Sequence, residues 1–327
     1  MSSHRGWLCS LGELDLGPLL YSLDIIVYIG IFGIVCLSLN LEYGFAGLAN
    51  FGKVAFFLTG AYTYAILSQL GVPFYVCIIV GVLISAIVGL LVSFPALRLR
   101  ADYLAIAVLA FGEILRLIVK SEDFAGGDWG MTVSPIFPYT TSSLIYRLEN
   151  IGLIFTFLAI CFIVVQLLAN SPYGRAMRAI REDEVAAEAL GKDRARFKAQ
   201  AFMLGSAMAG LAGGLYAQYL GYVVPGMFMP MVTFTVWIMV LLGGPANNWG
   251  VLLGAALVEI FDRGTNIVKD YIALPVDPSD LQYILFGALI IFILLYRPQG
   301  LLKESMIRTK TLRSAHDARR SIKNKGS

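Results

Sequence analysis

The residues of this chain whose types and spacing could do chemistry are charged side chains inside apolar sequence. Glu113 and Arg116 lie three positions apart within a long apolar stretch, so a helix would place them on one face. An opposite charge at that distance lowers the cost of removing either side chain from water. Such a pair either holds the fold together or forms part of a polar path through a membrane, and we favour the structural role.

A second candidate is the sequence GLANFGKV, from Gly47 to Val54, which almost fits the phosphate-binding loop pattern G-x-x-x-x-G-K-[ST]. Val54 stands where that pattern needs a hydroxyl for magnesium, and no strand precedes the segment. We therefore reject a nucleotide site here. Lys53 is expected to extend its ammonium group to a nearby membrane interface.

Catalytic and metal-binding patterns are missing from the sequence. No pair of its four cysteines has metal-ligand spacing, and both histidines, His4 and His316, lie outside the apolar stretches. Nothing resembles a nucleophile with its base or a pair of catalytic carboxylates. We predict a protein that is not an enzyme, has no catalytic residue and binds neither a cofactor nor a metal. The net charge of +3 gives no reason to expect nucleic acid as a partner.

The elements that position these residues are membrane helices. Hydrophobic residues make up 58% of the 327 positions and charged residues 14%, so most of the chain must have lipid as its solvent. We predict an all-α polytopic membrane protein with about 8–10 transmembrane helices. The apolar stretches are about 20–41, 44–69, 72–96, 102–120, 149–169, 199–222, 228–243, 248–263 and 280–296.

One long charged segment, 171–198, interrupts the apolar sequence. Ser171 followed by Pro172 is typical of a helix start, and Gly191 of a helix end, so we expect a helix over about 172–190. Met177 and Ile180 form a short apolar ridge on this helix, suited to a groove on a soluble partner. The alternative is a solvated loop whose charges only set the topology.

Positive charges orient the chain. The segment 171–198 carries seven Lys and Arg residues, which places it in the cytoplasm. With the stretches alternating from there, 18 of the 25 Lys and Arg residues fall inside and five outside. We predict a plasma or inner membrane protein with an extracytoplasmic segment 1–19, a transmembrane domain 20–302 with the cytoplasmic loop 170–198, and a basic cytoplasmic tail 303–327.

Several spans are predicted to be broken. Glycine and asparagine cluster in the first half of the second stretch and between the seventh and eighth, and interrupted spans often mark a transport site. The alternative is close helix packing through small residues, which we favour for the pairs Gly210/Gly214 and Gly250/Gly254. Candidates for the translocation path are Asn40, Gly44, Gly47, Asn50, Gly52, Gly243, Gly244 and Asn247.

Several ordered phrases between about residues 25 and 302 resemble the membrane permease subunit, of the M type, of ABC importers for branched-chain amino acids. The phrases are LRLRADYLAIAVLAFGEILRLI at 97–118, SPYGRAMRAIREDEVAAEALG at 171–191, FMLGSAMAGLAGGLYA at 202–217, NWGVLLGAALVEI at 248–260 and YRPQGLL at 296–302.

The resemblance implies a pore-forming subunit that works with a second permease, two cytoplasmic ATPases and an external solute-binding protein. ATP and magnesium would be bound by the ATPases, and the helix at 172–190 would be a coupling helix. The residues expected to couple to the ATPases are Arg175, Met177, Arg178, Ile180, Arg181, Glu182, Glu184 and Gly191.

Other functions are possible from the sequence. An ion-gradient-driven secondary carrier would need titratable groups in the spans, where Asp24 and Glu259 are candidates. A permease of the same family for urea or short amides is a closer alternative. A membrane scaffold would not need so many glycine breaks.

Overall fold

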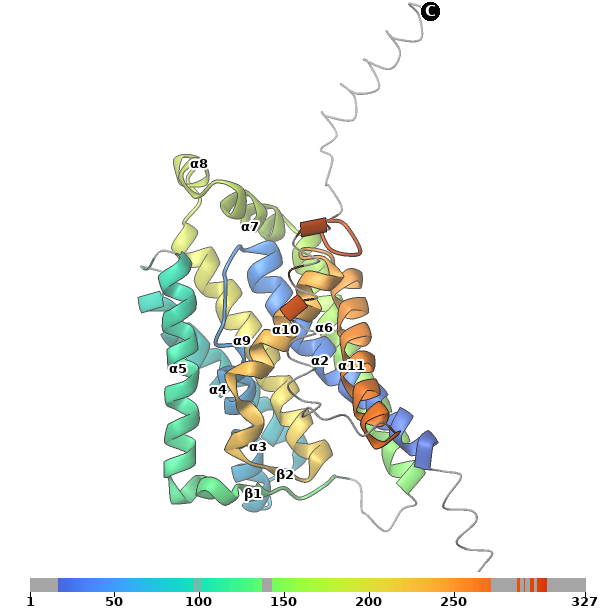
Figure 1. Ribbon diagram of the computed structural model, residues 1–327. Helices are drawn as coiled ribbons and strands as arrows, with labels where there is room; N and C mark the ends of the chain where they lie inside the picture. The colour runs from blue at the N-terminus through green and yellow to red at the C-terminus, as the bar shows by residue number, and fades with distance from the viewer. Residues whose placement is uncertain are drawn as a thin grey trace, which may run out of the picture.

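The computed structural model describes residues 17–96, 99, 101–136, 143–271, 287–288, 291, 295–296 and 299–304. Within these residues the chain is a bundle of long helices with a single short pair of strands, so the all-α prediction is confirmed (Figure 1). The predicted segment 1–19 and tail 303–327 lie mostly outside the described residues, as does the apolar stretch 280–296.

The helices follow the apolar stretches closely. By length and composition alone, Gly17–Phe45, Phe74–Pro95 and Ser143–Asn170 are long and apolar enough to cross a membrane, among the residues that the structure describes. The helices are α2 (Gly17–Leu39), η1 (Asn40–Phe45), α3 (Lys53–Gln69), α4 (Phe74–Ala96), α5 (Ala101–Ser121), α6 (Ser143–Asn170), α7 (Pro172–Glu182), α8 (Glu184–Ala189), α9 (Arg194–Leu220), α10 (Pro230–Gly243) and α11 (Asn248–Tyr271).

Small residues allow the central helices to approach one another. A side chain at Gly213 of α9 would overlap the carbonyl of Phe57 in α3, and one at Gly210 would overlap Ser85 of α4. A side chain at Gly254 of α11 would likewise meet the backbone of α10. The packing role predicted for Gly210 and Gly254 is confirmed, because the facing helices leave no room for a methyl group, and Gly213 has the same role.

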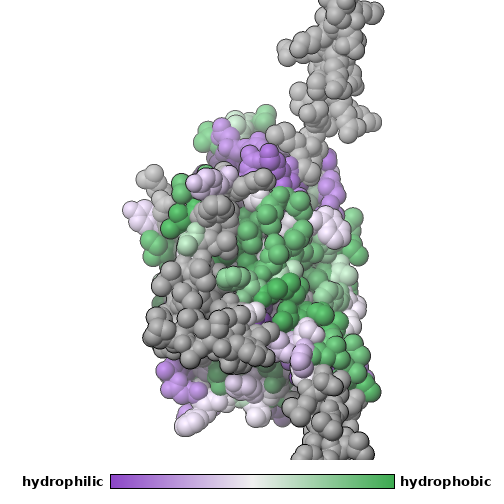
Figure 2. Space-filling model, turned by 45° about the vertical axis from the view of Figure 1, so that its right-hand side comes forward, coloured by the Kyte–Doolittle hydropathy of each residue, from purple (hydrophilic) through white to green (hydrophobic). Residues whose placement is uncertain are grey.

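Apolar side chains cover the outside of the bundle between two polar ends. Figure 2 shows a broad green area on the face that includes α11, below a purple region at the end where α7 lies. Leu253, Leu257 and Ile260 of α11 are among the exposed apolar side chains. A large exposed apolar surface is expected where lipid is the solvent.

The end of the bundle opposite α7 holds the segment between α5 and α6. Short 3₁₀ turns, η2 (Asp123–Ala125) and η3 (Gly127–Trp129), lead into strand β1 (Met131–Thr132). This strand pairs antiparallel with β2 (Tyr222–Val223), which follows α9 and precedes the turn η4 (Pro225–Phe228). The strand pairing thus attaches this segment to the bundle.

Candidate functional site

The broken second span is confirmed, and its break lies between α2 and α3. Helix α2 passes into the π-helical segment η1, and after it residues 46–52 are irregular until α3 begins at Lys53. Gly47 has a φ of +70°, a conformation that a side chain would strain. π-Helical turns within longer helices are uncommon and often occur at functional sites.

An ion pair joins the two ends of this break. Lys53 Nζ is 2.7 Å from Glu42 Oε1, and neither side chain has any exposed surface. The Asn50 side-chain amide donates to the other oxygen, Glu42 Oε2, at 2.9 Å. Both charges are therefore paired, as burial requires.

The pairing corrects one expectation and reveals one missed residue. Lys53 does not extend to a membrane interface, because its ammonium group finds a carboxylate within the bundle. Glu42 was not identified from the sequence. The available signal was that Glu42 precedes the lysine by eleven residues in otherwise apolar sequence.

Helix α10 contacts the end of the break that leads into α3. Trp237 Nε1 donates to the Asn50 carbonyl at 3.2 Å, and the Trp237 ring stacks on Phe51 with centroids 4.5 Å apart. The backbone N–H of Val54 donates to Thr233 Oγ1 at 3.1 Å. The first turn of α3 thus has a donor satisfied by α10 rather than by a cap of its own.

The structure brings the two predicted broken regions together. Asn40 donates to Asn248 Oδ1 and accepts from the Ala246 N–H, both at 2.8 Å. A side chain at Gly44 would come within 2.5 Å of the Ala246 nitrogen. The break after α2 therefore lies directly against the turn between α10 and α11.

The other path candidates lie in tight contacts. Side chains at Gly52, Gly243 or Gly244 would overlap neighbouring backbone, and Gly244 also has a φ of +108°. Asn247 caps α11 by accepting from Gly250 N at 3.1 Å, and donates to the Lys303 carbonyl at 2.9 Å. These contacts give each residue a packing role, and their place on a translocation path stays a prediction.

The predicted coupling helix is two helices rather than one. Asp183 is extended, with φ −152° and ψ 106°, and its carboxylate accepts from Val185 N and Ala186 N at 3.0 Å. Asp183 therefore caps a new helix, α8, instead of continuing α7. The predicted ends are confirmed, because Ser171 caps α7 and Gly191 follows α8 with a φ of +78°.

Helix α7 rests directly on the break. Arg181 Nη1 donates to the carbonyl oxygen of Gly44. A side chain at Gly47 would meet Arg181 Cγ at 2.9 Å, and the guanidinium group of Arg178 lies 5.0 Å from the centre of the Phe45 ring. Two of the predicted coupling residues thus contact the segment that carries the predicted path residues.

The orientation of α7 differs from the sequence expectation. Met177 and Ile180 are each only 1% exposed, so their ridge faces the bundle and not a partner. The apolar face of an amphipathic helix buries itself against the nearest apolar surface, which here is supplied by α6 and η1. The expectation that these two side chains dock in a soluble partner is therefore wrong.

A segment near the end of the described chain joins this contact. Glu304 accepts from Arg181 at 2.8 Å and lies 3.3 Å from Arg178 Nε. Burial lowers the pKa of Arg178, and the charge of Glu304 opposes that shift. Leu301 N and Leu302 N donate to the carbonyls of Leu242 and Gly243, at 2.8 and 3.1 Å, so the segment also binds the α10–α11 turn.

The remaining coupling candidates face outward. Arg175, Glu182 and Gly191 are exposed, while Glu184 is half-buried. Burial raises the pKa of Glu184, but hydrogen bonds from Lys198 and Arg194 outweigh it and lower that pKa below its usual value. The exposed apolar side chains of this region are two that the sequence reasoning did not select, Val185 at 75% and Leu190 at 82%.

The predicted pairing of Glu113 and Arg116 is confirmed. Arg116 donates through both Nε, at 2.9 Å, and Nη2 to the two carboxylate oxygens of Glu113 on α5. Both side chains are partly exposed on the surface of the bundle, away from the buried break. Whether the pair serves the fold or a path stays a prediction.

Comparison with known proteins identifies the family. The family described as "Branched-chain amino acid transport system / permease component" matches residues 21–294. The chain belongs to this family. It is a transport permease subunit and not an enzyme.

Individual relatives agree with this assignment. The chain is 33% identical to the high-affinity branched-chain amino acid transport system permease protein LivM of Salmonella typhimurium, over 86% of this chain and 70% of that protein. It is 31% identical to the probable permease LivM of Methanocaldococcus jannaschii, over 88% and 95%. The LivH permease of Escherichia coli is 27% identical over 83% and 91%. No solved structure matches the chain.

Proposed function

We propose that this permease forms one half of the membrane channel of an ATP-driven importer for branched-chain amino acids or similar small polar solutes. The second half would be a separate permease, as the likeness to both LivM and LivH proteins suggests. Two cytoplasmic ATPases would bind ATP and magnesium, and an external solute-binding protein would deliver the solute. The proposed orientation has the N-terminus outside and the C-terminus in the cytoplasm, as the distribution of positive charge indicates.

The observation that carries the proposal is the contact between Arg181 and Gly44. It links α7, on the polar end of the bundle, to the break in the second span through one charge-assisted hydrogen bond. Movement of α7 would pull on the carbonyl of Gly44 within η1. The same short segment holds Glu42, so the displacement would reach the ion pair with Lys53.

The ATPase would bind the side of α7 and α8 that faces away from the bundle. Val185 and Leu190 give this side an apolar contact surface, and Arg175 and Glu182 give it charge. A few side chains that become fully buried on association supply most of the affinity in protein interfaces. Met177 and Ile180, on the inner side, would keep α7 attached to the bundle while it moves.

Reconstitution in vesicles tests the proposal. This subunit alone should move no solute and hydrolyse no ATP. Uptake of radiolabelled leucine should appear only with both permeases, the ATPases and the binding protein, and should stop when the phosphate-loop lysine of the ATPases is mutated. Saturable uptake by the subunit alone under an imposed ion gradient would instead establish a secondary carrier. Uptake of urea or acetamide in preference to leucine would favour the alternative solute class.

A further inference from the structure

A cavity of about 470 Å³ lies at the end of the bundle opposite α7. Four helices meet there, namely the first turns of α2 and α6, the last turn of α9 and the second half of α11. This volume is in the range of small-molecule sites. The lining residues are Tyr21, Asp24, Tyr28, Ser143, Tyr146, Arg147, Tyr219, Leu220 and Arg263.

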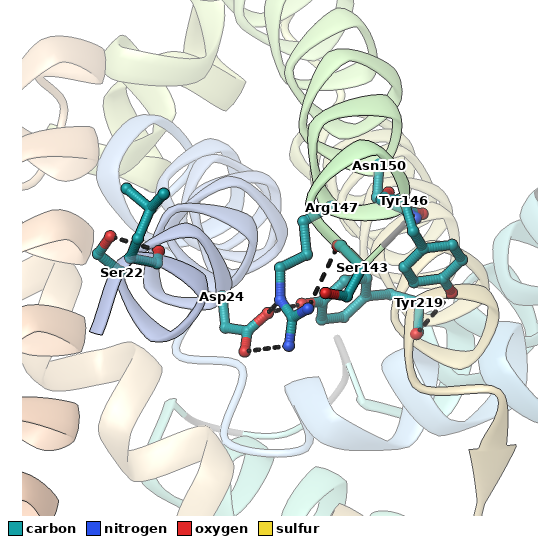
Figure 3. A network of polar contacts seen from close by, with 8 residues as sticks. Ser22, Asp24, Ser143, Tyr146, Arg147, Asn150 and Tyr219 are labelled. Atoms are coloured by element: carbon teal, nitrogen blue, oxygen red, sulfur yellow. Dashed lines mark hydrogen bonds and ion pairs between the residues drawn. The ribbon is translucent and has the colours of Figure 1, made fainter. Parts of the chain in front are cut away.

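One wall of the cavity carries a carboxylate held from two sides. Asp24 accepts from Arg147 Nε at 2.6 Å and Arg147 Nη2 at 3.2 Å, and from the hydroxyl of Tyr219 (Figure 3). Arg147 also donates to the Ser143 carbonyl at 3.3 Å. The carboxylate is thereby fixed in position, yet Asp24 and Arg147 remain 24% and 23% exposed.

The cavity lining also carries a second guanidinium group. Arg263 lies over the Tyr28 ring, with its central carbon 3.4 Å from the ring centre. Its Nε is 3.4 Å from Glu259 Oε2, and its carbonyl accepts from the Tyr21 hydroxyl at 2.9 Å. Arg263 is 24% exposed whereas Glu259 is almost fully buried, so the positive member of this pair is the one that faces the cavity.

We propose that this cavity binds a small zwitterion, a molecule with an ammonium and a carboxylate group on the same carbon atom. Tyr28 lies one helical turn after Asp24 on α2 and carries Arg263 on its ring, so the negative and the positive group are presented side by side. Asp24 accepts from the ammonium group, and Arg263 donates to the carboxylate. The tyrosine rings cover the remaining surface of the ligand and attract its ammonium group.

The charges of the cavity favour a zwitterion over other classes of solute. Each guanidinium group is already balanced by a carboxylate, so the wall as a whole is neutral. A solute with a net charge would bring an unbalanced charge into this site and should bind more weakly. An apolar solute would displace water from the charged groups without replacing its hydrogen bonds. A zwitterion satisfies both conditions. The inference rests on the proposed function, because it makes the cavity the place where the released solute first meets this subunit.

Equilibrium binding to the full permease–ATPase assembly in nanodiscs, without the solute-binding protein, tests the inference. Three probes of one shape are used: leucine, the amine isopentylamine and the acid 4-methylpentanoate. Leucine should bind saturably. The variant R263Q should weaken the binding of leucine and of the acid about tenfold or more, because losing one hydrogen bond to a charged group lowers affinity by about that factor. It should weaken the binding of the amine less than about twofold. The variant D24N should weaken the binding of leucine and of the amine, and leave the affinity for the acid unchanged.

This crossed pattern separates binding from folding. A variant that merely distorts the bundle would weaken the binding of all three probes by the same factor. That outcome would overturn the assignment of Asp24 and Arg263 to the two charged groups of the ligand. The control is D128N, which removes a carboxylate paired with Lys120 at the same end of the bundle but outside the cavity, and should change no affinity. No saturable leucine binding by an assembly that still imports leucine would sink the inference and leave the proposed function standing. An assembly that imports no leucine at all would contradict the proposed function itself.

Discussion

Glu42 and Lys53 are joined at 2.7 Å by an ion pair that no solvent reaches, and they belong to the two sides of a broken span. Glu42 lies in η1 before the irregular residues 46–52, and Lys53 begins α3 after them. The two ends of the break are thus held by charge rather than by a continuous helix. The pair therefore ties η1 to the first residue of α3.

The first prediction concerns the stability of this pair. Either E42Q or K53M leaves one buried charge or polar group without its partner, which costs on the order of 3–5 kcal/mol. The double variant E42L/K53M should recover most of the loss because no charge remains. Thermal unfolding of the purified subunit in detergent measures both effects. The variant K120A, which removes an exposed pair with Asp128, is the control and should stay within about 1 kcal/mol of the parent. A single variant as stable as the parent would contradict the assignment.

The second prediction concerns the link from α7 to the break. The variant R181A removes the hydrogen bond to Gly44 and should lower uptake by the reconstituted importer about 5- to 150-fold, the usual range of coupling energies, while the ATPases continue to turn over. The variant G47A should act in the same direction, since it strains the backbone and displaces Arg181. The variant R196A, which removes an exposed arginine of α9 outside the proposed ATPase contact surface, is the control for charge. Equal losses of uptake and ATP hydrolysis in R181A would show that the contact serves assembly instead.

A third prediction separates the two faces of the coupling region. The double variant V185D/L190D should leave the subunit folded and weaken ATPase binding about tenfold or more, because both side chains are exposed. The double variant M177D/I180D should detach α7 from the bundle, because it places two carboxylates without partners in a buried contact. Co-purification of the ATPases and protease sensitivity of 171–198 distinguish these outcomes. Normal ATPase binding by V185D/L190D would place the interface elsewhere.

How much of this site the sequence could predict depends on the kind of information required. Helix ends at Ser171 and Gly191 are local, so they were predictable from residue type. Asp183 is also a local signal, since aspartate is a common N-cap, but a single helix over 172–190 fits the same stretch of sequence. The pairing of Glu42 with Lys53 was not predictable, because it depends on the path of the irregular residues between them.

The misplaced ridge of α7 has a different cause. Spacing shows that Met177 and Ile180 share a face, and this was correct. Spacing alone does not tell whether that face is covered by the same chain or by a partner. Here the bundle itself covers that face. The apolar residues left for a partner are on α8 and directly after it, in the part of the chain that the sequence analysis predicted as the end of one continuous helix.

The fourth prediction concerns Glu113 and Arg116. If this pair is structural, either alanine variant should lower the melting temperature of the subunit, because the bidentate partner is lost. The double variant E113L/R116L should restore folding and most of the uptake. A double variant that folds well but transports nothing would instead place the pair on the solute path.

The fifth prediction concerns orientation. A reporter that is active only outside the cytoplasm should be silent when fused after Arg297 and active when fused near Trp129, following the excess of positive charge on the proposed inner side. Trp129 is almost fully exposed at the end opposite α7, so a fusion there should not disturb the bundle. The reverse pattern of activity would overturn the orientation, and with it the cytoplasmic placement of α7.

Neutral pairing inside the bundle has an electrical consequence. A charge that crosses a membrane works against or with the potential, at about 2.3 kcal/mol for each elementary charge and 100 mV. Four pairs each join a positive and a negative side chain on the membrane helices or at their ends: Asp24 with Arg147, Glu42 with Lys53, Glu113 with Arg116, and Glu259 with Arg263. When both members of a pair move together, no net charge is displaced. With a zwitterionic solute as well, the membrane voltage would neither drive nor oppose the opening of this subunit, and the whole of the work would be left to ATP.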